Sequence, residues 1–188
     1  MIPATIRAPH GMEMPAVFAV LAEYRVHLLG AAPLADADFP PDALLAVRNT
    51  IVDVDLDARA LVAVEEGRVV GFCCWDWLDH DARAARTVLI TVQRSRRGSG
   101  IGAALQRARM EAMWAAGAET IHTWSDDPSA IAWYERHFGY EAVGDEAIRH
   151  ALHRFRLGDS TWWALHRGFP ERGSLTHLVA RRHAEVHA

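Results

Sequence analysis

The sequence predicts an α/β fold (α+β in its element order), and three observations support this class. Two apolar runs over 60–65 and 68–77 flank a Glu-Gly turn signal, which predicts an antiparallel hairpin. A β-branched, apolar run over 87–92 leads through a glycine-rich turn into a helix expected over 101–116. A further strand and helix follow. A hairpin followed by alternating strands and helices favours a sheet with helices packed against it.

Length and composition indicate a single-domain globular protein and disfavour several other classes. The chain has 188 residues, of which 51% are hydrophobic, so we expect one domain over 1–188 with a proper core. The formal net charge of -4 argues against nucleic-acid binding as the main function. Cys73 and Cys74 are adjacent and cannot form an ordinary disulfide, which fits a reducing cytosol. With no apolar run of ~18 residues and no signal-peptide pattern, we expect a cytoplasmic protein without a membrane partner.

The first sixty residues are expected to contain one short strand and two helices. The strand is predicted over 4–7, and a helical pattern starts at Glu13 and ends near Gly30. The apolar face of this first helix comprises Val17, Val20, Leu21, Tyr24 and Leu28. A second helix is predicted from Asp42, a favourable N-cap residue.

After the glycine turn and its helix, the pattern predicts a strand over 119–124. Asp127 is then a suitable N-cap and Pro128 a suitable first residue for a helix running to about His137. Another strand is expected after Gly139. Further strand candidates are 151–157 and 161–165, and a terminal helix is predicted over 175–186.

The glycine turn reads Arg97-Gly-Ser-Gly-Ile-Gly-Ala103. Glycines let backbone N–H groups converge, and the helix start adds its own unpaired N–H groups, so the turn predicts an anion site for a phosphate or pyrophosphate. No Gly-Lys-Ser/Thr triplet occurs, which excludes a P-loop. Two interpretations remain, a dinucleotide fingerprint at Gly98, Gly100 and Ala103, or an R-x-x-G-x-G pattern at Arg97, Gly100 and Gly102. The position of the turn, mid-chain and after a hairpin, disfavours the dinucleotide interpretation.

A second motif favours the R-x-x-G-x-G interpretation. Asp127, Ala130, Tyr134 and Gly139 follow the pattern N-x-x-A-x-x-x-Y-x-x-x-G-F, with Asp in place of Asn and Tyr140 as the aromatic residue. Together with R-x-x-G-x-G, this segment resembles the GNAT superfamily of N-acetyltransferases. The resemblance is clear over about 61–144. It suggests a core of about 4–144, while the strands and terminal helix expected over 145–188 are atypical of the family.

The resemblance implies a GNAT-type mixed, mostly antiparallel central sheet, flanked by helices and splayed between strands four and five. Acetyl-coenzyme A (acetyl-CoA) would lie in the opening as cosubstrate, with no metal. Its pantetheine arm would pair with the backbone of Ile90, Thr91 and Val92. Its pyrophosphate would bind the turn residues Arg97, Gly98, Ser99, Gly100, Ile101, Gly102 and Ala103, and Asp127 and Tyr134 complete the implied coenzyme-binding set.

The implied reaction is direct attack of a primary amine on the acetyl thioester. Tyr134 lies at the family's position for the general acid that protonates the leaving thiolate. The expected strand carries no acidic residue over 87–92, so the general base stays open, and a water chain or an already deprotonated substrate are alternatives. The side-chain candidates for this base are Asp76, Asp79, His80, Asp81 and His122. The acceptor, a small-molecule or peptide amine, is not identified.

Other interpretations remain open beside this enzyme. A non-catalytic acyl-CoA sensor would explain the missing strand acid, and an NAD-binding protein would use the dinucleotide fingerprint. His183 and His187 have the i, i+4 spacing of helical metal ligands but lie near the chain end without a nearby cysteine, so no metal site is expected. A homodimer formed through the C-terminal region is an open alternative.

Overall fold

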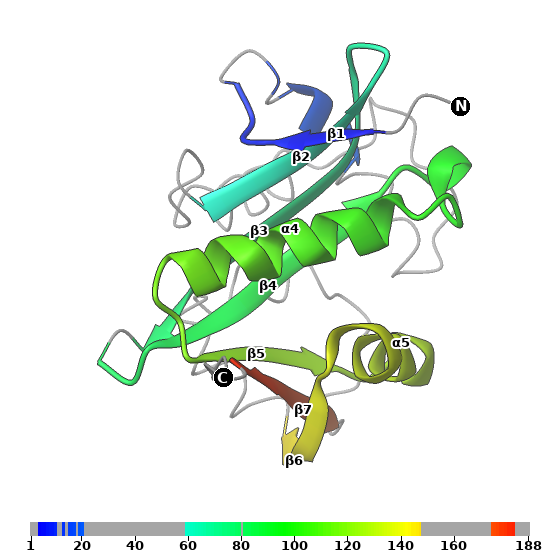
Figure 1. Ribbon diagram of the computed structural model, residues 1–188. Helices are drawn as coiled ribbons and strands as arrows, with labels where there is room; N and C mark the ends of the chain where they lie inside the picture. The colour runs from blue at the N-terminus through cyan, green and yellow to red at the C-terminus, as the bar shows by residue number, and fades with distance from the viewer. Residues whose placement is uncertain are drawn as a thin grey trace, which may run out of the picture.

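The computed structural model describes residues 4–10, 13, 15–17, 19–20, 59–79, 81–147 and 174–182. Its strands form one seven-stranded sheet in the order β1-β2-β3-β4-β5-β7-β6 (Figure 1). The strands are β1 (Thr5–Arg7), β2 (Ala60–Glu65), β3 (Arg68–Asp79), β4 (Ala84–Val92), β5 (Thr120–Ser125), β6 (Glu141–Ala147) and β7 (Ser174–Arg181). The helices are α4 (Ile101–Ala115), α5 (Pro128–Phe138) and the short 3-10 turn η3 (Arg94–Arg96).

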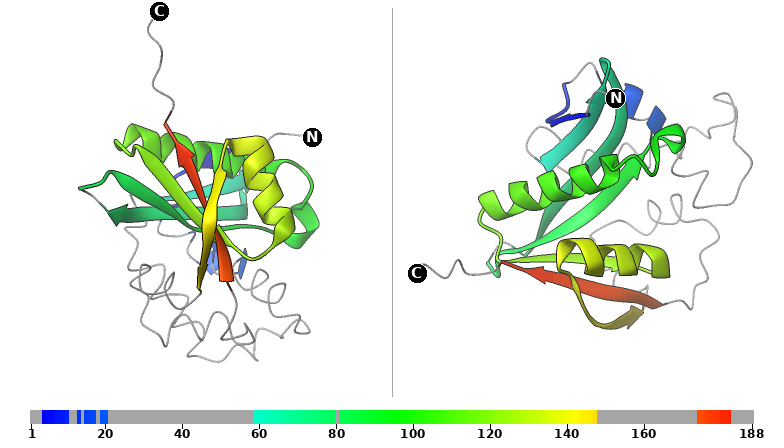
Figure 2. Two further views of the ribbon diagram at one scale, coloured as in Figure 1. Left: turned by 90° about the horizontal axis from the view of Figure 1, so that it is seen from below. Right: turned by 45° about the vertical axis from the view of Figure 1, so that its right-hand side comes forward.

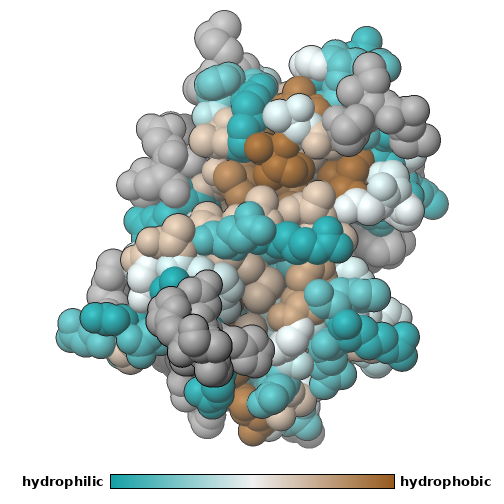
Figure 3. Space-filling model, viewed as in Figure 1, coloured by the Kyte–Doolittle hydropathy of each residue, from teal (hydrophilic) through white to brown (hydrophobic). Residues whose placement is uncertain are grey.

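The sheet is mixed and mostly antiparallel, which confirms the predicted fold class. Every neighbouring pair of strands is antiparallel except β4 and β5, which run parallel. Helices α4 and α5 cover one face, and the helical residues 15–17 and 19–20 lie against the other (Figure 2). The outer side of α4 exposes Arg107 and Glu111, and Figure 3 shows a hydrophilic surface along this helix.

The local signals of the central region produce the expected elements. Glu66 and Gly67 both have positive φ, 49° and 75°, as the two-residue turn between β2 and β3 requires. Asp127 caps α5 by accepting a hydrogen bond from the Ser129 N–H at 2.8 Å, and Pro128 follows as the first helical residue. Gly139, with φ of 66°, ends that helix.

Strands β4 and β5 part after three residue pairs. They pair only at Ala84–Thr120, Ala85–Ile121 and Arg86–His122, and then diverge (Figure 1). At the point of parting, the buried hydroxyls of Thr87 and Thr123 lie 2.6 Å apart. The splay implied between the fourth and fifth strands is therefore confirmed, and most of β4 has a paired neighbour only on its β3 side.

The helix predicted over 175–186 is wrong where the structure describes it. Residues 174–181 form β7, which lies between β5 and β6. Leu178 and Val179 are both buried although successive strand residues point to opposite faces, so burial does not alternate here. The resulting continuous apolar run cannot be distinguished from a helix face by periodicity alone. The rest of this predicted helix, the helix from Asp42 and the strands over 151–157 and 161–165 lie outside the described residues.

Two further findings concern the described ranges only. None of their helices is long and apolar enough to cross a membrane. They also contain no cluster of three or more His, Cys, Asp or Glu side chains arranged to hold a metal ion. The histidine pair His183 and His187 lies outside these ranges.

The adjacent thiols of β3 give a first testable prediction. Burial raises the pKa of Cys73 to about 11 and that of Cys74 to about 12. Both side chains should therefore resist a thiol reagent at pH 8 in the native protein and react once it unfolds. Unfolded thiols ionise near ~8.5, so the free energy of unfolding should fall as pH rises from there towards 11. Rapid labelling of the native protein would contradict the buried placement.

Candidate active site

The edge of β4 that faces the parting presents alternate backbone groups. The Gln93 N–H donates to the Val70 carbonyl at 2.9 Å, so the backbone groups of Gln93 point towards β3. In an antiparallel pair every second residue has this orientation. By alternation Thr91 also turns its backbone towards β3, whereas Ile90 and Val92 turn theirs towards the parting. Two of the three predicted pantetheine-binding residues thus offer backbone groups on the open side.

A β-bulge interrupts β4 beside this edge. Leu89 pairs with Cys74 and Thr87 with Trp75, so Val88 is an extra residue without a partner on β3. Val88 and Leu89 consequently pack on the same side of the sheet, against the cluster that contains Val17 and Val20. Bulges re-aim backbone and side chains locally, and this one lies where β4 has lost its β5 neighbour.

A buried polar array on α4 underlies the bulge. Nη1 of Arg109 donates to the carbonyls of Cys74 at 3.1 Å and Leu89 at 2.7 Å, and Nη2 donates to Oε1 of Gln106. The Gln106 amide in turn donates to the Tyr140 hydroxyl at 3.2 Å. Gln106 and Arg109 are both 0% exposed. We did not predict this array, although Arg109 occupies an i+4 position between Leu105 and Met113 on the expected apolar face, where a charged residue is a signal.

The glycine turn leads directly to the end of β4. Gly98 and Gly100 have φ of 78° and 87°, which other residues adopt only with strain. The first helical hydrogen bond runs from the Ala104 N–H to the Gly100 carbonyl at 3.0 Å, and no side chain caps the helix. The N–H groups of Ile101, Gly102 and Ala103 therefore have no partner within α4. These groups and the positive end of the helix dipole favour an anion.

The arginines beside the turn have different roles. Arg97 is exposed, and its Nε donates to the Val92 carbonyl at 3.2 Å, which holds the turn against the end of β4. Arg96 instead forms an ion pair with Glu65 at 2.6 Å. The hydroxyl of Ser99 donates to the Arg96 carbonyl at 2.6 Å and steadies the turn. Of these two arginines, Arg97 contacts the end of β4 beside the turn, whereas Arg96 is paired with Glu65 of β2.

Tyr134 lies on the side of α5 that faces the sheet. It is 7% exposed and belongs to a cluster with Ala85 of β4 and Ile121 of β5. Its ring meets that of Tyr140 edge-on, with centroids 5.1 Å apart. Burial is also the main reason that the pKa of the Tyr140 hydroxyl is raised. Asp127, the other predicted residue of this segment, uses its carboxylate to cap α5.

Three of the predicted base candidates have structural partners or exposed positions. Asp76 forms ion pairs with Arg59 and, at 3.6 Å, with Arg86. Asp79 accepts hydrogen bonds from the N–H groups of Asp81 and Ala82 and so closes the turn before β4. Asp81 is exposed on that turn. The fourth candidate, His80, lies outside the described residues.

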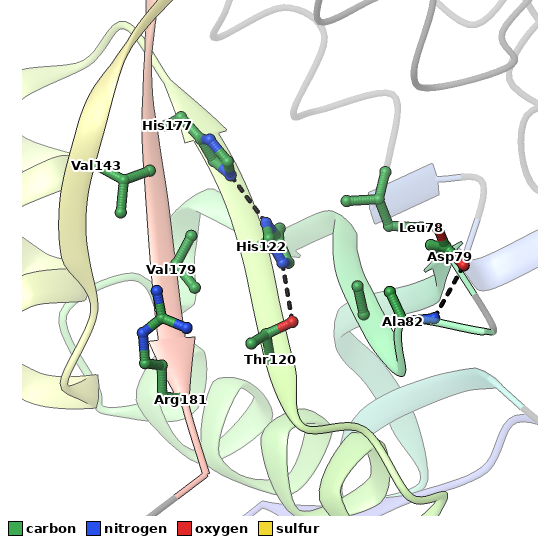
Figure 4. Close-up of a pocket in the computed structure, with 10 residues that line it drawn as sticks. Leu78, Asp79, Ala82, Thr120, His122, Val143, His177, Val179 and Arg181 are labelled. Carbon is green, nitrogen blue, oxygen red and sulfur yellow. Dashed lines mark hydrogen bonds between the residues drawn. The ribbon is translucent and has the colours of Figure 1, made fainter.

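His122 belongs to a hydrogen-bonded chain of side chains (Figure 4). Its Nδ1 lies 2.9 Å from Nε2 of His177, and its Nε2 lies 3.0 Å from the Thr120 hydroxyl. The His177 ring stacks on Trp124 at 4.4 Å. His122 pairs with Arg86 at the last contact before β4 and β5 part. We did not predict His177, because the segment around it was assigned to a helix.

This chain of side chains borders a cavity of about 570 Å³. The lining residues are Leu78, Asp79, Ala82, Ala84, Thr120, His122, Val143, His177, Val179 and Arg181. Strands β5 and β7 bring His122 and His177 together at its wall, as Figure 4 shows. Because neighbouring imidazoles can exchange a proton along a hydrogen bond, the arrangement can carry a proton between His122 and His177 at the cavity wall.

Residues 21–140 match the Acetyltransferase (GNAT) family, so the chain belongs to the GNAT acetyltransferase family. No match was found among curated protein sequences.

Solved structures share the fold at low sequence identity. A ribosomal-protein-alanine N-acetyltransferase from Brucella melitensis superposes with a TM-score of 0.66 at 17% identity, covering 95% of this chain and 99% of that one. A phosphinothricin acetyltransferase from Sinorhizobium meliloti, in complex with acetyl-CoA, gives 0.63 at 19% identity, covering 96% and 89%. The protein yncA from Salmonella typhimurium, solved with acetyl-CoA, gives 0.65 at 16% identity, covering 97% of each chain.

Proposed function

We propose that this protein is an N-acetyltransferase that transfers the acetyl group of acetyl-CoA to a primary amine. One observation carries the proposal, namely that the uncapped start of α4 adjoins the unpaired edge of a splayed β4. The first feature suits a pyrophosphate and the second suits the amides of a pantetheine arm. Two of the structural relatives were solved with acetyl-CoA, which supports the same coenzyme here.

The coenzyme is proposed to follow the open side of β4. Its pyrophosphate accepts hydrogen bonds from the N–H groups of the turn and of Ile101, Gly102 and Ala103. Its pantetheine amides pair with the backbone of Ile90 and Val92, the residues whose backbone groups face the parting. Glycine at position 102 leaves room for this approach, since a Cβ there would meet only the Val92 Cγ2 at 3.7 Å.

The chemistry is then direct attack of the amine nitrogen on the thioester carbon. The Ile90 N–H is proposed to stabilise the oxyanion, as a preorganised donor at the unpaired edge. When the C–S bond breaks, the Tyr134 hydroxyl gives its proton to the leaving thiolate. Tyr134 suits this role because α5 places it in the cluster next to β4 and β5.

We propose His122 as the general base, with His177 as its proton partner. The other described candidates either hold an ion pair, close a turn or lie exposed on that turn. A base must be neutral to accept a proton from the amine, and imidazole titrates near neutral pH. The hydrogen bond between the two imidazoles then passes this proton from His122 to His177.

Replacing His122 with glutamine tests this role. We expect kcat to fall about 10²-fold, because general base catalysis typically contributes at least that factor. The acidic limb of the pH–rate profile, where His122 becomes protonated, should disappear in the variant. Exposed His137 on α5 provides the matched control, since His137→Gln should leave the profile unchanged. An unaltered acidic limb in His122→Gln would assign the base elsewhere.

A measurement of turnover distinguishes the proposed enzyme from the second candidate function, a non-catalytic acyl-CoA sensor. The experiment follows coenzyme A release from acetyl-CoA with a panel of polyamines, amino acids, aminoglycosides and peptides with free N-termini or lysines. The proposal predicts amine-dependent release with at least one class. Tight coenzyme binding without release across the whole panel would favour the sensor.

A further inference from the structure

The guanidinium of Arg109 is fully buried and has no carboxylate partner among the described residues. The ion pairs of the described ranges all involve other arginines. Its hydrogen-bond partners are two backbone carbonyls and one amide side chain, and its Nε has no partner. Burying an arginine charge without an opposite charge is costly, and the group stays ionised. An arginine buried on this face of α4, where Gln106 is its one polar side-chain partner, needs a compensating role.

The two carbonyls that Arg109 binds belong to one residue pair next to the bulge. Cys74 and Leu89 are the last regular pair before Val88 interrupts the register. Nη1 of Arg109, which projects from α4, donates a hydrogen bond to the Leu89 carbonyl at 2.7 Å and holds it pointing away from the parting. This contact fixes the orientation of the whole peptide unit between Leu89 and Ile90, because a peptide group is planar.

The same peptide unit carries the Ile90 N–H. Peptide bonds in the described ranges are trans, so the carbonyl of Leu89 and the N–H of Ile90 point in opposite directions. A carbonyl held towards Arg109 thus aims the N–H of Ile90 at the parting of β4 and β5. The positive charge behind the carbonyl also polarises the peptide, which makes its N–H a stronger donor.

We propose that Arg109 is a positioning residue that orients and polarises the Leu89–Ile90 peptide as the donor to the acetyl thioester oxygen. The inference rests on the proposed function and deepens it by naming what holds the donor in place. Gln106, bonded to both Arg109 and Tyr140, keeps the guanidinium in its plane. A fixed positive charge behind the donor gains interaction energy as the oxyanion forms, which is the condition for lowering the barrier.

The test uses acetyl-CoA labelled with ¹³C at the acetyl carbonyl and isotope-edited infrared difference spectroscopy on the full chain. No acceptor amine is needed. In the wild-type protein, the bound thioester C=O stretch should move to lower wavenumber than in free acetyl-CoA, because a hydrogen bond polarises it. In Arg109→Met this displacement should be largely lost, and Arg109→Lys, which keeps the charge but not the fork, should restore part of it. Met113→Leu, a volume-conserving change on the same buried face, should match wild type.

Turnover gives the second readout once an acceptor is found. Arg109→Met should lower kcat about tenfold or more while the dissociation constant of coenzyme A changes less, since a lost oxyanion donor costs about 10²–10³ and here the donor is misaligned. If the thioester C=O stretch in Arg109→Met is displaced as far as in the wild-type protein, the inference is overturned and the proposed function stands. If Arg109→Met does not fold, Arg109→Lys decides, and a full displacement there overturns the inference. Failure of the wild-type protein to bind acetyl-CoA would overturn both.

Discussion

Replacing Gly102 with valine is expected to abolish acetyl-CoA binding while the protein stays folded. Gly102 lies in the first turn of α4 with ordinary helical φ, and an added Cβ meets nothing closer than 3.7 Å. The protein therefore does not need glycine here for packing, and Gly102→Ala should even stabilise it by about 0.5–1 kcal/mol. A side chain there would instead occupy the space proposed for the pyrophosphate. Losing two charge-assisted hydrogen bonds should weaken binding by about 100-fold or more.

Calorimetric titration with coenzyme A and thermal melting together check this prediction. Ala108→Val, on the same helix but away from the turn, controls for the effect of valine on α4 and should bind normally. Gly100 would be a poorer choice, because its φ of 87° means that any side chain strains the backbone. A folded Gly102→Val variant that retains full affinity would contradict the proposed pyrophosphate site.

Replacing Tyr134 with phenylalanine is expected to lower kcat about 10²-fold or more with little change in coenzyme affinity. The substitution removes only the hydroxyl, and the ring keeps its edge-on contact with Tyr140. Proton donation by a positioned group contributes about 10²–10⁴ to rate, so its loss should appear in kcat. The measurement is steady-state turnover with the acceptor found in the amine panel, beside the dissociation constant of coenzyme A.

Tyr140→Phe is the matched comparison. It removes a buried hydroxyl that accepts a hydrogen bond from Gln106 at 3.2 Å, so it should cost about 1 kcal/mol of stability. Its effect on turnover should be much smaller than that of Tyr134→Phe. If both tyrosine variants retain wild-type turnover, Tyr134 is a structural aromatic of the α5 cluster and not the acid.

The sequence allowed prediction of elements whose signals are local. The strands over 60–65 and 68–77 were predicted from alternation and a turn pair, and the structure extends only the second, to Asp79. Asp127 and Gly139 marked the two ends of α5 because capping and left-handed conformations depend on single residues. The splay followed from the family resemblance, since it depends on how far β4 and β5 stay paired.

The parts that could not be predicted depend on contacts between distant segments. β7 is a strand because β5 and β6 pair with it from both sides, which no pattern within 174–181 encodes. His177 therefore meets His122 only through strand pairing across 55 residues of chain. Arg109 reaches the bulge carbonyls for a similar reason. A charged residue on an apolar helix face was visible, but its partners are backbone groups, which carry no sequence signal.

Coenzyme binding by the wild-type protein tests the central claim most directly. Thermal melting with acetyl-CoA, coenzyme A, NAD or ATP compares the ligands under one condition, since a ligand that binds the folded state raises the melting temperature by mass action. We expect acetyl-CoA and coenzyme A to raise it strongly and NAD to have no effect. A rise with NAD and none with either coenzyme A species would contradict the proposed function and reassign the glycine turn to a dinucleotide.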